Sequence, residues 1–146
     1  MAEMKYAKYI LTDLHLSEEQ QKGEAEYAKR GIRVFWLEDF VIEGAPSVIC
    51  SWYTKATEEP GTIAHIHDFD EVVGLLGGDP DNPYDLGGEV EFWIEDEKYM
   101  LTKSCLIFCP KGVKHCPLHV RKVTRPIMFL AFSTTLNYKK ILDAQQ

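Results

Sequence analysis

The feature that most constrains the fold is a series of short segments rich in β-branched and aromatic residues, which runs along most of the chain. Turn-forming clusters separate the segments, notably "GGDPDNPYDLGG" at 77–88 and "CPKG" at 109–112. Many short strands at close spacing are typical of an all-β sandwich or barrel. The predicted strands cover residues 33–42, 47–56, 62–67, 71–77, 89–102, 104–110, 114–123 and 126–134.

The residues before these strands contain a helix start signal. Ser17 and Gln20 fit a capping box, and Gly31 can end the helix that begins there. The run "VFWLEDFVI" at 34–42 has more β-rich apolar content than one small barrel needs, so we expect added strands and a homodimer. The expected organisation is one domain, with an N-terminal helix and added strands at 1–44, a barrel at 45–134, and a tail with a final helical turn at 135–146.

Length and composition set the broad class of the protein. A chain of 146 residues suits a single domain with one core. Its four cysteines include no C-x-x-C pair and its first residues carry no secretory signal pattern, so we expect reduced thiols and a cytoplasmic protein. No apolar run approaches the roughly 18 residues of a membrane-spanning helix, so no membrane partner is expected. The net charge of −7 argues against a nucleic-acid partner.

A group of potential metal ligands begins in the predicted strand 62–67. His65 and His67 are separated by one residue, so their side chains lie on the same face of that strand. Glu71 opens the next strand and shares a face with apolar residues that are expected to point into the core. A buried carboxylate beside two buried histidines is costly unless a cation lies among them. The pattern favours a metal site; the alternative is a metal-free protein whose histidines are hydrogen-bonded core groups.

A third histidine follows a tight turn further along the chain. Pro110 and Gly112 mark the turn, and His115 enters the strand after it. With these residues the chain resembles the cupins. Their first motif runs Gly, five residues, His-x-His, three or four residues, Glu, six residues, Gly; their second runs Gly, five residues, Pro-x-Gly, two residues, His, three residues, Asn. The matching residues are His65, His67, Glu71 and Gly78 in the first motif and Pro110, Gly112 and His115 in the second.

Three positions depart from these motifs. Gly61 has only three residues between it and His65, Ser104 replaces the opening glycine of the second motif, and His119 stands where asparagine is usual. None of these departures removes a ligand. The resemblance covers about residues 45 to 134.

The resemblance implies a double-stranded β-helix, or jelly roll, in which one divalent transition-metal ion is bound. The implied ligands are His65, His67, Glu71 and His115. Imidazoles with one carboxylate suit Fe, Mn, Ni, Zn, Co or Cu, and four protein ligands leave two positions open on an octahedral ion. Those positions can bind water, dioxygen or an oxygen-rich substrate.

His119 is a candidate catalytic base, because it lies four residues from His115 and has the same strand parity. Pro117 lies between them and can break the strand, so an exposed or merely hydrogen-bonded histidine is the alternative. By the same parity, Cys116 is expected to face away from the ligands.

The acidic loop at 77–89 is a candidate lid. Its Gly and Pro content excludes regular structure, and its length is near the top of the usual range for ordered connections. Tyr84 is the one large side chain that can close over the mouth of a pocket. The alternative is a solvated loop far from the opening.

The function expected from these features is metal-dependent catalysis on a small, oxygen-rich metabolite bound in the barrel. Cupin folds support many chemistries, so the class remains open between a dioxygenase, an isomerase and a decarboxylase. The alternative is a non-catalytic cupin that binds or senses a small molecule. An enzyme needs exchangeable positions on its metal and a titratable group within reach of the substrate, whereas a binding protein needs neither.

Overall fold

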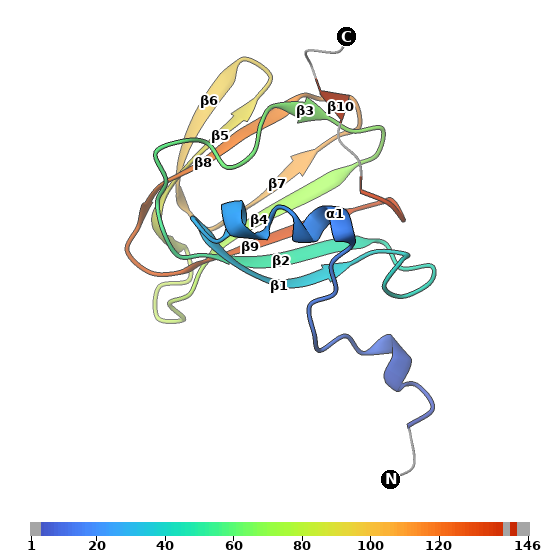
Figure 1. Ribbon diagram of the computed structural model, residues 1–146. Coiled ribbons are helices and arrows are strands. Elements are labelled where there is room, and N and C mark those ends of the chain that lie inside the picture. Colours follow the sequence, from blue (N-terminus) through green and yellow to red (C-terminus); the bar gives the residue numbers. More distant parts are fainter. Residues whose placement is uncertain (1–3, 139–140, 143–146) are drawn as a thin grey trace.

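The computed structural model describes residues 4–138 and 141–142. The described residues form two five-stranded sheets that pack face to face, with all neighbouring strands antiparallel (Figure 1). The helices are η1 (Ala7–Tyr9), α1 (Glu18–Gln21) and α2 (Glu24–Tyr27). The strands are β1 (Gly31–Leu37), β2 (Ser47–Tyr53), β3 (His65–Ile66), β4 (Glu71–Gly77), β5 (Asp85–Ile94), β6 (Glu97–Lys103), β7 (Cys105–Cys109), β8 (His115–Val123), β9 (Ile127–Ser133) and β10 (Ile141–Leu142). One sheet has the order β1-β2-β9-β4-β7 and the other β10-β3-β8-β5-β6.

The core lies between the two sheets because their strands turn alternate side chains inward. In β2 every second residue from Ser47 to Tyr53 is buried. Leu75 and Ile127 from one sheet belong to the same buried cluster as Val90 and Phe92 from the other. The all-β prediction is therefore confirmed, and the inner faces of both sheets form the walls of a barrel.

The predicted strand at 89–102 is a hairpin instead of one strand. β5 ends at Ile94, β6 begins at Glu97, and Glu95 adopts a left-handed φ of 52° between them. The sequence has no Gly, Asn or Pro at this turn, so the usual signal was missing. Contacts with Lys114 hold the turn instead: Glu95 N–H donates to the Lys114 carbonyl at 2.8 Å, and Lys114 N–H donates to the Glu95 carboxylate at 3.0 Å.

The N-terminal helical segment is shorter than the sequence predicted. The capping box is present, because Gln20 N–H donates to Ser17 Oγ at 3.2 Å and Ser17 N–H donates to Gln20 Oε1 at 3.0 Å. Gly23 then separates α1 from α2, and Gly31 lies inside β1 instead of capping a helix. A Cβ atom at Gly31 would lie 2.0 Å from the Trp52 carbonyl oxygen, so the pairing of β1 with β2 requires glycine there.

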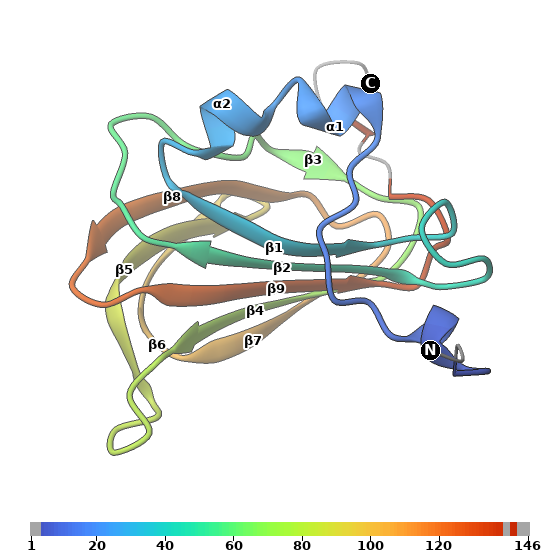
Figure 2. The same ribbon diagram turned by 60° about the horizontal axis from the view of Figure 1, so that its bottom comes forward.

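Strand β1 extends the first sheet at its edge, beside β2, and α1 and α2 lie outside the two sheets, on the side of β1 and β3 (Figures 1 and 2). The expected helical turn in the tail is wrong for residues 141–142, which form β10 and pair with β3. Residues 135–138 of the tail form no helix either, and residues 139–140 and 143–146 lie outside the described part of the chain. Among the described residues, no helix is long and apolar enough to cross a membrane.

Candidate metal centre

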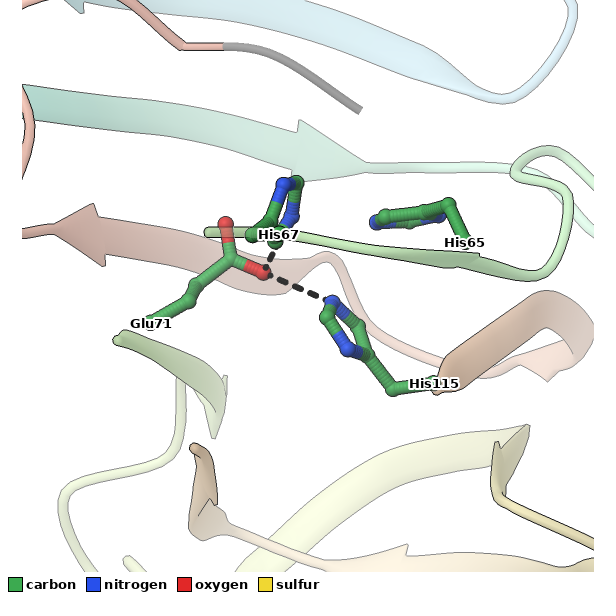
Figure 3. A group of neighbouring side chains, drawn as sticks. All are labelled: His65, His67, Glu71 and His115. Atoms are coloured by element: carbon green, nitrogen blue, oxygen red, sulfur yellow. Dashed lines mark hydrogen bonds and ion pairs between the residues drawn. The ribbon is translucent and has the colours of Figure 1, made fainter. Parts of the chain in front are cut away.

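Four potential ligands from three strands and one connection converge inside the barrel. His65 lies in β3, His67 follows that strand, Glu71 opens β4 and His115 opens β8 (Figure 3). All four residues are between 1% and 3% exposed, and one ligand atom from each lies within 4.8 Å of the others. The structure thus brings together the four residues that the sequence singled out as a set.

Local pairing explains how residues from the two motifs meet. β3 and β8 are antiparallel neighbours, and His65 is directly opposite His115 in their register. The turn before His115 is also tied to the first motif, because Gly112 N–H donates to the His67 carbonyl at 3.0 Å. Gly112 has a φ of 82°, which a residue with a side chain rarely adopts.

Backbone carbonyl groups orient two of the imidazole rings. His65 Nδ1 lies 2.6 Å from the Ile63 carbonyl oxygen, and His115 Nδ1 lies 3.1 Å from the Val113 carbonyl oxygen. A carbonyl oxygen only accepts, so Nδ1 carries a proton in both rings, and Nε2 is the nitrogen left to bind an ion at the centre of the group. Metal-bound histidines commonly have this outer hydrogen bond.

The carboxylate of Glu71 completes the group. Its Oε1 lies 3.1 Å from His115 Nε2 and 3.6 Å from His67 Nε2, and its Oε2 accepts a hydrogen bond from Ser133 Oγ at 3.1 Å. Burial alone would raise the pKa of Glu71, but the hydrogen bonds and charges of His115 and His67 outweigh it and lower the pKa to about 2. Glu71 is thus held as an anion, with one oxygen directed at the histidines.

These separations suit a metal ion. Ligand atoms about 2.1 Å from one ion lie about 3.0 Å apart when adjacent in an octahedron and about 4.2 Å apart when opposite. The 3.1 Å separation of His115 and Glu71 is close to the adjacent value, and the 4.8 Å limit of the whole group is slightly wider than the opposite value. The group can therefore hold a divalent ion after a small contraction, and its imidazole and carboxylate donors suit first-row transition metals.

The group opens onto a cavity of about 110 Å³ inside the barrel. His65 and Glu71 form part of its wall. Tyr27 from α2, Arg30 from the turn after it and Arg33 from β1 also line the cavity. The rest of the wall is mainly apolar or aromatic and consists of Trp36, Ile49, Tyr53, Thr62, Val73, Phe92, Cys116, Leu118, Phe129, Ala131 and Tyr138.

Tyr138 is a site residue that sequence reasoning missed. Its ring centroid lies 4.9 Å from that of His67, and its backbone N–H donates to the buried carboxylate of Glu38. Burial, with the nearby Glu71 carboxylate, raises the pKa of the Tyr138 hydroxyl, so this group stays protonated. Tyr138 follows the last predicted strand, in a stretch with no recognisable motif, so the sequence carried no signal for it.

The parity argument fails in β8. The register with β5 shifts between Phe92 and Ile94, and Cys116 has a φ of 70°. Cys116 therefore lines the cavity, contrary to the prediction that it faces away. His119 is buried, and its two ring nitrogens contact groups outside the metal-ligand set. Its Nε2 lies 2.6 Å from the Thr57 carbonyl oxygen, and Arg121 Nη1 lies 3.1 Å from its Nδ1. Both nitrogens are engaged and His119 is not among the cavity residues, so its catalytic role stays a prediction without support from its position.

The loop at 77–89 does not form the expected lid. None of the described residues that line the cavity belongs to it, and Tyr84 is 73% exposed. The loop instead packs on Ser104, which lies between β6 and β7: Ser104 Oγ donates to the Pro83 carbonyl at 2.8 Å and accepts from Gly77 N–H at 2.9 Å. Among the described elements, α2 comes nearest to the role expected of a lid, because Tyr27 from this helix lines the cavity.

The sequence matches no known family model and no curated protein. Its structure is similar to that of a conserved protein with a double-stranded β-helix domain from Klebsiella pneumoniae, with 14% identity, a TM-score of 0.52 and coverage of 91% of this chain and 95% of that one. It is also similar to the DMSP lyase DddQ from Ruegeria pomeroyi, with 17% identity, a TM-score of 0.50 and coverage of 90% of this chain but 61% of DddQ. An RmlC-like cupin from Shewanella frigidimarina matches with 23% identity, a TM-score of 0.39 and coverage of 60% and 64%.

At these identities the similarity is one of fold. The chain has the double-stranded β-helix fold that the resemblance to the cupins implied.

Proposed function

We propose that the protein is a metal-dependent cupin enzyme that acts on a small, oxygen-rich metabolite in the barrel cavity. The proposed ligands of its divalent transition-metal ion are His65, His67, Glu71 and His115. The observation that carries this proposal is the buried group of three imidazoles and one carboxylate, part of which lines the wall of the cavity. Three imidazoles and one carboxylate leave a divalent ion with a net charge of +1, which favours oxygen-rich or anionic ligands.

The surrounding residues support this chemistry. A bound divalent ion supplies Lewis acidity and coordination positions for the oxygens of a substrate or for dioxygen. The Ile63 and Val113 carbonyls hold the rings of His65 and His115, and Ser133 holds the second oxygen of Glu71. These contacts keep the donor atoms in position without the ion, which lowers the cost of assembling the site.

A dioxygenase, an isomerase and a decarboxylase or other lyase are the candidate reaction classes. DddQ, which shares the fold, is a DMSP lyase, so the fold accommodates lyase chemistry. Proton transfer in any of these reactions needs a group at the cavity wall, and Tyr138 places a protonated hydroxyl beside Glu71. The apolar part of the wall would exclude bulk water from the substrate.

The second candidate is a cupin that binds or senses a small molecule without changing it. The position of His119 favours this alternative, because the predicted base lies outside the cavity wall. Under this alternative the same metal and pocket would hold a ligand, but no group would need to titrate during binding.

Metal analysis and assays of turnover test the proposal. Protein purified without chelators and then reconstituted should contain about one divalent ion per chain, as a single His₃Glu site requires. Oxygen-uptake and product assays on a panel of small organic acids then separate an enzyme from a binding protein. A reconstituted protein with far less than stoichiometric metal would refute the metal site, and saturable ligand binding with no product would favour the second candidate.

We also propose that the protein forms a homodimer through the outer face of the β1-β2-β9-β4-β7 sheet. Leu106 is 70% exposed and Phe108 is 59% exposed on β7, and Phe108 pairs across the sheet with Val72 of β4, which in turn pairs with Phe132 of β9. Contiguous exposed apolar side chains on one face are typical of protein interfaces. Sedimentation analysis at micromolar concentration should show a dimer that Phe108→Glu converts to a monomer; a monomeric wild type would refute it.

A further inference from the structure

The cavity wall has a second polar part, formed by Tyr27, Arg30 and Arg33, which we call the arginine end. Both guanidinium groups stack on the ring of Tyr27, with Arg30 Cζ at 4.4 Å and Arg33 Cζ at 4.5 Å from its centroid. The same cavity is lined by His65 and Glu71, which belong to the proposed metal site. A ligand in the cavity can therefore contact both ends.

Specific contacts position the two arginines. Arg30 Nη1 donates to the Gly61 carbonyl at 2.6 Å, and a Cβ atom at Gly61 would lie 2.2 Å from that nitrogen. Arg33 Nε lies 3.1 Å from Glu24 Oε1, and its side chain is only 13% exposed. Gly61 and Glu24 thus hold the guanidinium groups against the cavity.

Each arginine keeps a buried donor for another partner. Within the described residues, Arg30 Nε and Arg33 Nη1 are buried and have no hydrogen-bond acceptor. A buried donor of a charged group without an acceptor is costly, and a planar guanidinium fits a carboxylate well. These donors indicate an anionic ligand group at the arginine end.

The charge balance of the cavity favours a ligand with two negative charges. At the arginine end, two guanidinium groups carry two positive charges and the Glu24 carboxylate carries one negative charge, so the net charge is +1. At the proposed metal end, a divalent ion would exceed the Glu71 carboxylate by one positive charge. A dianion with one charge at each end would neutralise both excesses, and the mainly apolar rest of the wall strengthens both attractions.

The lining and the volume of the cavity limit the rest of the ligand. The rest of the wall includes the apolar side chains of Ile49, Val73 and Phe129, which suit methylene groups and not further charges. The volume of about 110 Å³ leaves room for only a short chain. We propose that the ligand is a short-chain dicarboxylate, with one carboxylate at the metal site and the other on Arg30 and Arg33. This inference rests on the proposed function and names its substrate class.

Calorimetric titration of the metal-loaded protein tests the assignment, with malonate, succinate and glutarate as probes. At least one should bind, and Arg33→Gln should weaken that probe about 10-fold to 100-fold, because a lost charged hydrogen bond costs about 1.5–3 kcal/mol. Glu24→Gln should strengthen binding, because it removes the carboxylate that competes for Arg33. Arg33→Lys should retain part of the affinity, since it keeps the charge without the planar fork.

Control measurements separate this result from general effects. Arg121→Gln removes one charge from a side chain that is 49% exposed and not among the cavity residues, so its affinity should match that of the wild type. Acetate and butyrate should bind at least about 10-fold more weakly than the best dicarboxylate, because they lack the second charged contact. Unchanged melting temperatures and metal content would show that Arg33→Gln remains folded and loaded.

Three outcomes would overturn the inference: no dicarboxylate binds the loaded protein, Arg33→Gln and Glu24→Gln bind as the wild type does, or inorganic phosphate binds more tightly than every dicarboxylate. Failure of the metal site would be visible separately, as a low metal content. In that event the probes are titrated into metal-free protein, where Arg33-dependent binding would still support the anion site and its absence would overturn it.

Discussion

The metal end and the arginine end of the cavity are built in different ways. The metal end uses residues of the barrel itself, and main-chain carbonyls and Ser133 orient its side chains. The arginine end uses α2 and the start of β1, held by aromatic stacking, one ion pair and one main-chain contact. A rigid barrel thus provides a site suited to general metal chemistry, and the segment before it provides groups that select a ligand. Ligand specificity can thus be added to a fold by a segment at its edge.

The largest expected effect is the loss of a ligand at the metal end. His115→Ala should reduce metal affinity by at least about 100-fold, more than the 10-fold to 100-fold typical of an outer contact. The matched control is His119→Gln, which changes another buried histidine of β8 whose nitrogens contact Thr57 and Arg121. Metal content after dialysis against a fixed free-metal concentration measures both. Equal metal loss in the two variants would mean that the His₃Glu group is not the binding site.

The two ends also differ in how well the sequence predicted them. The ligands His65, His67 and Glu71 lie close together in the chain, and strand parity with a turn placed them on one side. Arg30 and Arg33 had no such pattern, because a register shift between Arg33 and Phe35 interrupts the alternation in β1. A weak signal existed in Gly61, which departs from the cupin motif and whose missing side chain makes room for Arg30.

Two other departures of the structure from the sequence predictions also arise from tertiary contacts. The hairpin turn at Glu95 depends on hydrogen bonds to Lys114, which is distant in sequence. The register shift in β8 moves Cys116 to the cavity wall, where alternation predicted the opposite face. Alternation therefore predicted the regular strands and the first motif, and it failed where a bulge or a long-range contact changes the register.

Removal of the metal should lower the melting temperature, and a change at the arginine end should not alter the size of that shift. A ligand at 100 times its dissociation constant stabilises a folded protein by about 2.7 kcal/mol, which for a domain of this size is about 5–10 °C in melting temperature. We expect this shift in the wild type and in Arg33→Gln, but not in His115→Ala. Thermal melts with and without excess Zn²⁺ measure it. A shift that depends on Arg33 would show that the two ends are coupled.

Acid titration of the metal-free protein tests the electrostatics of Glu71. Its lowered pKa of about 2 means that the folded state favours the carboxylate, which adds stability above the ordinary value of 4.5. That contribution, on the order of 3 kcal/mol, should disappear as the pH falls from 4.5 through about 2. Urea unfolding at several pH values should therefore show that Glu71→Gln is less stable than the wild type at pH 6 and that the difference narrows towards pH 3. A constant difference would contradict this origin.

A smaller effect is expected from the hydroxyl that holds Glu71. Ser133→Ala should weaken metal binding by about 10-fold, the lower end of the range for an outer hydrogen bond to a ligand. Ser47→Ala is the matched control, because Ser47 is a buried serine directly opposite Ser133 in the register of β2 and β9. Competition with a chelating dye measures both affinities. A Ser47→Ala effect as large as that of Ser133→Ala would point to packing instead of the hydrogen bond.

The smallest effect is expected from the loop that sequence reasoning chose as a lid. Residues 79–82 form its tip, where Asn82 N–H donates to the Asp79 carbonyl at 3.1 Å, and none of the described cavity residues comes from this tip. Replacing 79–82 with Gly-Ser-Gly-Ser keeps Pro83 and Tyr84, whose carbonyls accept hydrogen bonds from Ser104. Metal content and dicarboxylate affinity should both stay within about twofold of the wild type, because distant surface changes have small effects.

By contrast, Tyr27→Ala in α2 should weaken dicarboxylate binding, since it removes the ring on which both guanidinium groups stack. If the loop variant lost affinity and the Tyr27 variant did not, the groups that select the ligand would have to be sought in the 77–89 loop and not in the N-terminal segment.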